Sequence, residues 1–297
     1  SRSACSYAGR SDGSSPRNNA GESDLFPQML VSGNNVYIAW NDESNGGDRD
    51  VFFRASNNNG LTFNPVIDLS NNNGFSFLQQ MLASANNVYV IWTDNSNGGD
   101  DDLFFRVSNN NGLTFNPVID LSDNDGDTGG SQMLVSGDNV YVVWVDREVN
   151  LGDYSVLFRI SNNNGLTFNP VVILTSNSQI ELDFQEMIVL GNNVYVLWQD
   201  EEGLHQAGDS EIYFTVSNNN GLTFNPVTNL SDNDGISTRA DMIISGKNVY
   251  VVWEDESNGG DRDVFFRASN NNGQTFNPFI DLSSNNGESR IPIMLVG

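Results

Sequence analysis

The ten-residue stretch Ser56-Asn-Asn-Asn-Gly-Leu-Thr-Phe-Asn-Pro65 decides the fold, because it returns four more times with a single variable position. The further copies begin at Ser108, Ser161, Ser217 and Ser269, at spacings of 52, 53, 56 and 52 residues. A fixed period of this length is typical of proteins that repeat one supersecondary unit. The chain of 297 residues therefore contains five units of about 53 residues each.

Each unit is predicted to contain four short strands. In the first unit we expect them at 28–32, 36–40, 51–55 and 63–69, separated by segments rich in Asn, Gly and Asp. Two further markers keep the same period: a Met-containing apolar segment that occurs six times, and an Asn-Val-Tyr strand that ends in Trp40, Trp92, Trp144, Trp198 and Trp253.

The second strand of each unit is apolar on both faces, so its sheet has to be covered on both sides. No apolar stripe with helical period is present. Four-stranded sheets that repeat radially, each packed between two neighbours, form a β-propeller, and an open solenoid of hairpins is the alternative. We expect an all-β, five-bladed propeller over residues 21–297, preceded by a flexible leader at 1–20 that carries Cys5.

Composition excludes several classes of partner. The chain has 38 acidic and 13 basic residues, a net charge of −25 and one lysine, Lys247. Such a chain lacks the basic clusters that give affinity for nucleic acid. No apolar run reaches the ~18 residues needed to cross a bilayer, so no membrane insertion is predicted. With a single Cys5 and a single His205, an intramolecular disulfide and a His-based catalytic triad are excluded.

The repeated turn resembles the Asp-box, or BNR repeat, of sialidase-like propellers. The matching segments are 56–63, 108–115, 161–168, 217–224 and 269–276, all with Asn where that motif most often has Asp. In those families the box is structural and lies opposite the active site. The resemblance therefore implies the fold and says little about chemistry.

Sialidases also use an arginine triad, a Tyr–Glu pair and an Arg-Ile-Pro motif. Here Arg290-Ile291-Pro292 matches the tripeptide after the last repeat, and Arg239 lies at a corresponding position, counted from the glycine that closes the segment. Arg239 and Arg290 are thus the candidate ligand-binding residues. The loops on the face of the propeller where ligands commonly enter carry most of the acidic residues. Two arginines beside these acidic loops are a poor electrostatic match for an anionic sugar.

Carboxylates spaced two apart in glycine-rich loops predict a possible cofactor, Ca²⁺, which prefers oxygen ligands. Solvated acidic turns are the competing interpretation. The candidate metal ligands lie in three similar loops: Asp42, Asp48 and Asp50; Asp94, Asp100 and Asp102; Asp255, Asp261 and Asp263.

The near-identity of the repeats and the missing catalytic set favour a non-catalytic extracellular or cell-surface module that recognises protein or glycan or assembles with other molecules. The alternative is a glycoside hydrolase of sialidase type, and a third hypothesis is a calcium-stabilised surface protein.

One predicted strand is in excess. The sixth Met-containing segment, 291–297, is an inner strand without the other three strands of its blade. It belongs to a longer repeat, or replaces 28–33 in closing the ring, or pairs with another copy of the chain in self-assembly.

Overall fold

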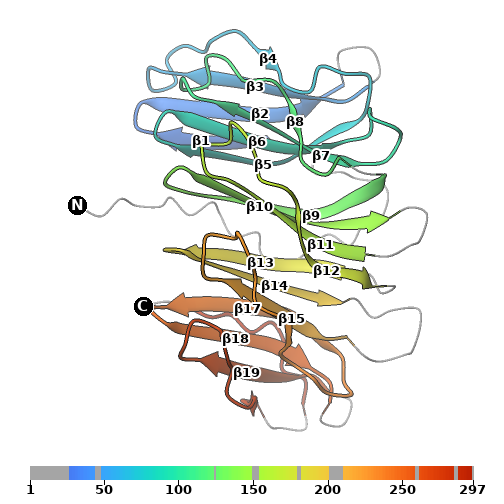
Figure 1. The fold of residues 1–297 in the computed structure, drawn as a ribbon. Coiled ribbons are helices and arrows are strands. Elements are labelled where there is room, and N and C mark those ends of the chain that lie inside the picture. Colours follow the sequence, from blue (N-terminus) through green and yellow to red (C-terminus); the bar gives the residue numbers. More distant parts are fainter. Residues whose placement is uncertain are drawn as a thin grey trace.

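The computed structural model describes residues 27–43, 48–123, 125–148, 154–178, 182–200, 210–257, 261–283 and 287–295. The predicted leader, with Cys5, and the loop that contains His205 lie outside these residues. The described residues form five four-stranded antiparallel sheets, each built from strands consecutive in sequence, and contain no helix. The prediction of an all-β, five-bladed propeller is confirmed, and the five sheets follow one another in chain order (Figure 1).

The first two blades consist of β1 (Gln28–Ser32), β2 (Asn35–Asp42), β3 (Asp50–Ser56), β4 (Ile67–Asp68), β5 (Ser76–Ser84), β6 (Asn87–Asp94), β7 (Asp102–Ser108) and β8 (Ile119–Asp120). The third and fourth consist of β9 (Gly126–Ser136), β10 (Asn139–Glu148), β11 (Tyr154–Ser161), β12 (Val172–Ser178), β13 (Leu182–Leu190), β14 (Asn193–Asp200), β15 (Ile212–Ser217) and β16 (Thr228–Asn229). The fifth consists of β17 (Ser237–Ser245), β18 (Asn248–Asp255), β19 (Asp263–Ser269) and β20 (Ile280–Asp281).

The fourth strand of the first blade is shorter than the predicted 63–69. Asn64 donates its amide to the carbonyl of Ala55 at 2.8 Å as part of the turn, and Pro65 has no amide to donate. Regular pairing is therefore limited to Ile67 and Asp68, opposite Phe53 and Phe52.

The repeated Ser-Asn turn is held by side chains. The Ser56 hydroxyl donates to Asn58 Oδ1 at 2.9 Å and accepts from the Gly60 amide at 2.9 Å. Asn58 Oδ1 also accepts from the Thr62 amide at 2.9 Å. These bonds recur in all five copies, so Asn satisfies the backbone of the turn without a carboxylate.

The core lies between blades. Four hydrophobic clusters each join one blade to the next, and their largest buried side chains are the repeated Trp, Tyr and Phe. The phenylalanine of each later turn packs edge-on against a ring of the preceding blade, as Phe115 does on Phe53 with centroids 4.9 Å apart. These contacts place four phenylalanines between blades: Phe115, Phe168, Phe224 and Phe276.

The innermost strands are joined by one repeated hydrogen bond. The residue before each Met accepts from the Met amide of the next blade: Gln28 from Met81 at 2.8 Å, Gln80 from Met133 at 2.7 Å, Gln132 from Met187 at 2.7 Å and Glu186 from Met242 at 3.3 Å. Each inner strand therefore positions the one that follows it.

The C-terminal segment continues this series. The Met294 amide donates to Asp241 Oδ2 at 2.9 Å, so residues 290–295 occupy the place of a sixth innermost strand, although they form no paired β-strand. Among the described residues, no hydrophobic cluster joins the fifth blade to the first. The first and last sheets lie at opposite ends of the row (Figure 1). The described residues of the first and fifth blades therefore do not share a hydrophobic cluster.

Candidate functional site

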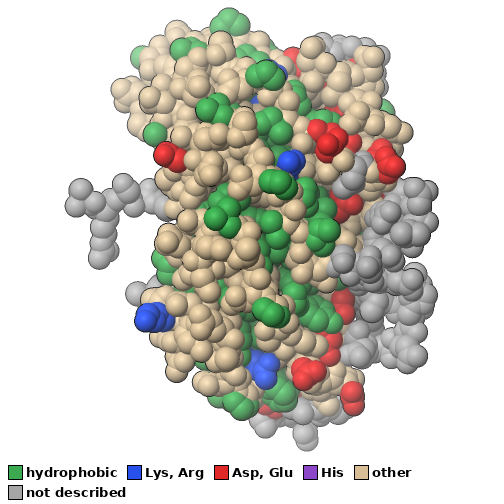
Figure 2. Space-filling model, in the orientation of Figure 1, with side chains coloured by type: hydrophobic (Ala, Val, Ile, Leu, Met, Phe, Trp, Pro, Cys, Tyr) green, Lys and Arg blue, Asp and Glu red, His purple; other side chains and the backbone are tan. Residues whose placement is uncertain are grey.

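The loops that join the second strand to the third, and each blade to the next, lie at one face of the propeller, here called the rim. The predicted acidic excess is found there, and Figure 2 shows acidic side chains concentrated along that edge of the molecule. The Ser-Asn turns lie at the opposite face.

Three of the predicted metal ligands form hydrogen bonds within their own blades. Each begins a third strand, is buried, and accepts a hydrogen bond from a serine at the end of the fourth strand. The pairs are Ser70 with Asp50 at 2.8 Å, Ser122 with Asp102 at 2.8 Å and Ser283 with Asp263 at 2.6 Å. The same serines accept the next backbone amide, so each carboxylate anchors a loop.

The carboxylates that end the second strands also have protein donors. Asp94 and Asp255 are fully buried, and each accepts from an asparagine of the preceding loop at 2.8 Å. Asp255 further accepts from Trp253 Nε1 at 2.9 Å and from the Ser257 hydroxyl. Burial alone raises the pKa of Asp255, but hydrogen bonds from Ser257, Trp253 and Asn233 outweigh it and hold the pKa below its usual value.

The other predicted ligands lie in the loops themselves. Asp42 ends β2 and is half-buried, and Asp100 lies in the loop before β7. Asp48 Oδ1 and Asp261 Oδ2 are buried and have no hydrogen-bond partner within the described ranges. In that part of the chain, no group of three or more Asp, Glu, His or Cys side chains is placed to hold a metal ion. Calcium binding at these loops stays a prediction.

The carboxyl group of Asp102 has a strongly raised pKa. Burial raises its pKa to about 6, and the nearby Asp120 and Asp100 act in the same direction against hydrogen bonds from Ser122 and Asn97. Its side chain is buried and accepts a hydrogen bond from the Ser122 hydroxyl.

The structure brings the side chain of Arg239, and the backbone next to Arg290, to one carboxylate. Glu254, at the rim end of β18, has a side chain only 1% exposed. Both of its oxygens lie 3.2 Å from Arg239 Nη1, and Oε2 also lies 3.2 Å from Arg262 Nη1. The Ile291 amide, next to Arg290, donates to Glu254 Oε1 at 2.6 Å. We call Arg239, Glu254, Glu256, Arg262 and Arg290 the arginine–glutamate cluster.

Local backbone geometry directs these side chains. Arg239 lies in a β-bulge of the β17–β18 pair and has a φ of 55°, which is unusual for a residue other than glycine. Its side chain remains 44% exposed beside the buried Glu254. Arg290 pairs with Glu288 at 2.5 Å on the surface. The cluster thus presents the exposed guanidinium group of Arg239 on the buried Glu254, and the exposed guanidinium group of Arg290 paired with Glu288.

The expected equivalence of Arg239 and Arg290 is off by one residue. The hydrogen bond of Met294 to Asp241 matches that of Met242 to Glu186, which makes Ile291 the counterpart of Arg239. Ile291 also has a φ of 55°. Counting back from the closing glycine missed this because the last segment is one residue shorter after its Met.

Two residues of the cluster were not predicted from the sequence, Glu254 and Arg262. The position after the conserved Trp is Asn41, Thr93, Val145 and Gln199 in the other units, so a glutamate there departs from the repeat. That departure from the repeat was the feature of the sequence that could have identified Glu254. Arg262 donates to Glu256 Oε1 at 2.5 Å as well as to Glu254, and so links the two carboxylates.

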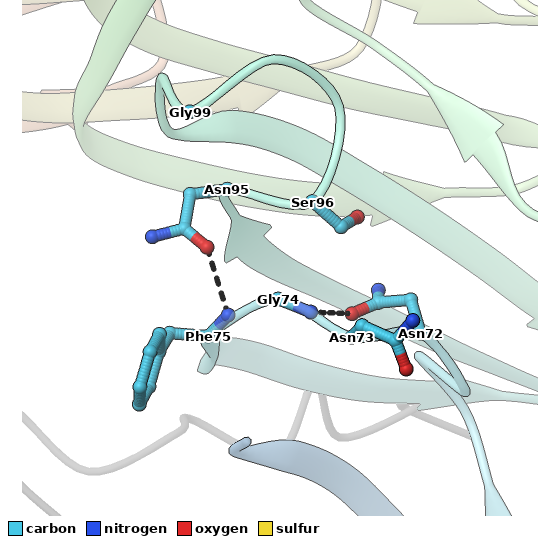
Figure 3. Close-up of a pocket in the computed structure, with 7 residues that line it drawn as sticks. All are labelled: Asn72, Asn73, Gly74, Phe75, Asn95, Ser96 and Gly99. Carbon is cyan, nitrogen blue, oxygen red and sulfur yellow. Dashed lines mark hydrogen bonds between the residues drawn. The ribbon is translucent and has the colours of Figure 1, made fainter. Parts of the chain in front are cut away.

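A surface hollow lies on the rim between the first and second blades. It is lined by Asn72, Asn73, Gly74, Phe75, Asn95, Ser96 and Gly99 (Figure 3). Asn95 accepts the Phe75 amide and Asn72 accepts the Gly74 amide, both at 2.8 Å, which fixes its floor. The hollow belongs to other blades than the arginine–glutamate cluster.

The fold is shared with enzymes that cleave carbohydrates. An ulvan lyase of polysaccharide lyase family PL25 matches with a TM-score of 0.56 at 14% identity, over 84% of this chain and 68% of that chain. The α-L-arabinofuranosidase arb93a from Fusarium graminearum gives 0.48 at 12% identity, over 89% and 82%. A thermostable family-43 glycoside hydrolase gives 0.41 at 14% identity, over 90% and 94%.

No protein-family model and no curated protein sequence matches the chain. The ulvan lyase structures, which share the fold, contradict the prediction of a non-catalytic recognition or assembly module, because they are glycan-degrading enzymes. The alternative, a glycoside hydrolase, is nearer to them. Within the ranges that the structure describes, no helix is long and apolar enough to cross a membrane.

Proposed function

We propose that this chain is a carbohydrate-processing enzyme that cleaves glycosidic bonds of a polysaccharide at the arginine–glutamate cluster. The observation that carries the proposal is Glu254, a buried carboxylate held by two guanidinium groups at the rim end of an inner blade strand. The shared fold with glycan-cleaving enzymes supports it. Fold alone does not give function, so the proposal depends on the cluster.

The geometry assigns different tasks to the members of the cluster. The exposed guanidinium groups of Arg239 and Arg290 can donate to sugar oxygens in a planar, fork-like arrangement. Glu254 orients Arg239 and Arg262 and is itself out of reach of solvent. Glu256, with 23% of its side chain exposed, is the carboxylate available to a substrate.

Hydrolysis of a glycosidic bond needs a carboxyl group that protonates the leaving oxygen while water attacks the anomeric carbon. Arg262 bridges Glu254 and Glu256, which therefore lie on two sides of one guanidinium group. We assign Glu256 to acid–base chemistry and Glu254 to positioning. Removing Glu254 should then release both arginines without removing the group that moves the proton.

Charge favours a neutral polysaccharide as the substrate class. The arginines of the cluster are matched by Glu254, Glu256 and Glu288, and the surrounding rim is acidic. A polyanionic chain would be repelled by this rim at low ionic strength.

The test compares variants on a panel of neutral and uronate-containing polysaccharides. Cleavage is measured as the rate at which new reducing ends appear. Arg239→Gln and Arg290→Ala should each lower the rate of cleavage at least about tenfold, the loss of roughly one charge-assisted hydrogen bond. Lys247→Gln, an exposed cation on the opposite face, should leave the rate unchanged. Equal rates in all variants would remove the cluster from the reaction.

Three finer assignments are part of the same proposal. The hydrogen bonds of the Ser-Asn turns support a relation to Asp-box propellers of the sialidase type. The acidic, lysine-poor composition supports an extracellular or cell-surface location. Asp48 Oδ1 and Asp261 Oδ2, which have no hydrogen-bond partner among the residues that the structure describes, support calcium at the loops. The predicted self-assembly, in which segment 291–297 pairs with another copy of the chain, stays a prediction.

A further inference from the structure

The hollow on the rim between the first and second blades has the same framework as the loops that carry Glu256 between the fourth and fifth blades. In both places, the aspartate that ends a second strand accepts from an asparagine of the preceding loop, at 2.8 Å, and from the amide of the serine two residues later, at 2.8 and 2.9 Å. The asparagine in turn accepts the amide of the glycine two residues after it. The equivalent residues are Asn72 and Asn233, Gly74 and Gly235, Asp94 and Asp255, and Ser96 and Ser257.

The two loops also approach each other equally closely in both places. A Cβ on Gly74 would lie 2.6 Å from the amide nitrogen of Ser96, and a Cβ on Gly235 would lie 2.4 Å from that of Ser257. Glycine is therefore required at this point, because the backbones leave no room for a side chain. The chain thus builds one concave turn twice, and the two copies differ in the side chains around it.

The hollow lacks the carboxylates of its counterpart. Asn95 takes the place of Glu256, and Thr93 takes the place of Glu254. None of the described residues that line the hollow carries a charge, although the chain has a net charge of −25. The hollow therefore keeps the framework of the proposed catalytic loop without its acid–base group. The residues at the position of Asn95 in the other units are all charged: Glu43, Arg147, Glu201 and Glu256.

Phe75 adds an exposed aromatic ring at the edge of the hollow. It is 44% exposed, although an aromatic side chain gains most from burial. Its amide donates to Asn95 Oδ1 at 2.8 Å, and the residue pairs with Arg49 of the first blade in a short parallel bridge. The backbone that carries the ring is therefore held in place while the ring stays open to solvent. In the later loops the position of Phe75 is occupied by Asp127, Ile236 and Glu288.

Polar groups beside the ring are available to a ligand. Asn95 accepts the Phe75 amide through Oδ1, and its Nδ2 has no acceptor within the described residues. In the same part of the chain, the exposed side chains of Asn73 and Ser96 donate to no protein group. Figure 3 shows Asn95 and Phe75 to one side of Gly74 and Asn73 to the other. The hollow is open and has a volume of about 620 Å³, within the range of natural small-molecule sites.

We propose that this hollow is a second carbohydrate-binding site, which holds a neutral polysaccharide without cleaving it. One sugar residue stacks the apolar face formed by its C–H groups on the ring of Phe75. The next residue of the polymer exchanges hydrogen bonds with the amides of Asn73 and Asn95 and the hydroxyl of Ser96. No carboxyl group is among the described residues that line the hollow, so none is present there to protonate a glycosidic oxygen.

The ligand class of this site rests on the proposed function, because the polymer held here is the one cleaved at the arginine–glutamate cluster. A polysaccharide attached at two places on one rim remains near the cluster after each cut, which raises its effective concentration there. Phe75→Ala should therefore raise KM for long polysaccharides several-fold and leave kcat unchanged. Short oligosaccharides should be cleaved equally well by Phe75→Ala and the original chain.

Binding can be measured apart from cleavage in a chain that carries Glu256→Gln. Affinity electrophoresis through gels that contain galactan, arabinan, xylan or mixed-linkage glucan gives the dissociation constants, with polygalacturonate as the anionic polymer. At least one neutral polysaccharide should retard the protein, and polygalacturonate should not. Adding Phe75→Ala should weaken binding about tenfold, whereas Phe75→Tyr, which keeps a ring, should retain it. Asn73→Ala should weaken binding about threefold, and gives a second test if Phe75→Ala does not fold.

Phe279→Ala is the matched control, since Phe279 is an aromatic residue with a similar exposure, 42%, outside the hollow. It should leave binding unchanged, and the melting temperature of Phe75→Ala should equal that of its background. The site is overturned if no neutral polysaccharide binds, or if Phe75→Ala and Asn73→Ala bind as tightly as their background. Binding lost with Phe75→Ala in a chain that cleaves nothing would overturn the proposed function alone. Cleavage of a polysaccharide whose binding Phe75→Ala leaves unchanged would overturn this site alone.

Discussion

Asp241 Oδ2 accepts the amide of Met294 at 2.9 Å, the fifth in a series of bonds that begins with Gln28 and Met81. The residue that accepts is Gln at the first three junctions, then Glu, then Asp. A sixth inner-strand place is therefore specified by the fifth blade, whichever segment fills it.

The bonds of this series should differ in their effect on stability. Gln80→Ala leaves the amide of the fully buried Met133 without a partner, and should lower the free energy of unfolding by about 1–3 kcal/mol. Asp241→Ala releases the C-terminal segment and should change the free energy of unfolding by less than Gln80→Ala does, while amide exchange at Met294 becomes at least about tenfold faster. Urea titration and hydrogen exchange measure the two effects. A similar loss of stability in both variants would contradict the series, and Gln80→Glu, which keeps an acceptor, is the control.

Asp102 should give the protein a pH-dependent stability. Its pKa is raised by burial to about 6, so the folded state keeps a proton that the unfolded state loses near pH 4. Stability from this group is therefore present below about pH 4 and falls as the pH rises to about 6, by at most about 3 kcal/mol.

Asp102→Asn should remove this fall and be more stable than the original chain above about pH 6, with little difference below about pH 4. Urea unfolding across this range is the measurement. Asp138→Asn makes the same charge change at an exposed position on the opposite face, and should not alter the pH profile in this way. Parallel profiles for Asp102→Asn and the original chain would refute the assignment.

Asp255 should be essential to the fifth blade. It accepts from Trp253, Asn233 and Ser237, at 2.9, 2.8 and 2.9 Å, and is fully buried. Asp255→Ala leaves these donors without an acceptor and should lower the free energy of unfolding by about 3 kcal/mol or more. Tryptophan fluorescence during urea unfolding reports the change, with Lys247→Gln as the surface control. A loss below about 1 kcal/mol would show that water replaces the carboxylate.

Calcium should raise the melting temperature if the loops bind it, because a ligand of the folded state stabilises that state by mass action. Saturating Ca²⁺ added after EDTA should give a rise of several degrees, and Mg²⁺ a smaller one. Asp48→Asn should reduce the rise, because it removes a carboxylate oxygen that has no hydrogen-bond partner within the described ranges. Identical melting curves in EDTA and Ca²⁺ would end the calcium hypothesis.

The repeat made the fold predictable, because each turn and strand appears five times and its pattern of apolar residues is local. The site was less predictable. Glu254 meets Arg239 and Arg262 only after strand pairing and a bulge bring three separate segments together. The loop carboxylates were interpreted as metal ligands, although the serines that bind three of them, Ser70, Ser122 and Ser283, recur in the sequence at a fixed distance of 20 residues.

The burial of equivalent side chains was hidden by the same repetition. Met29 and Met81 have the same sequence surroundings, so only the structure shows that Met81 is buried and Met29 exposed. A periodic sequence therefore does not show which of its equivalent side chains are covered.

The most direct test of the account is the rate at which the purified full chain releases reducing ends from neutral polysaccharides, measured beside Glu256→Gln and Lys247→Gln. The account predicts cleavage of at least one neutral polysaccharide, lost by a factor of at least about one hundred in Glu256→Gln and retained in Lys247→Gln. Absence of cleavage on every polysaccharide tested, or undiminished cleavage in Glu256→Gln, would contradict it.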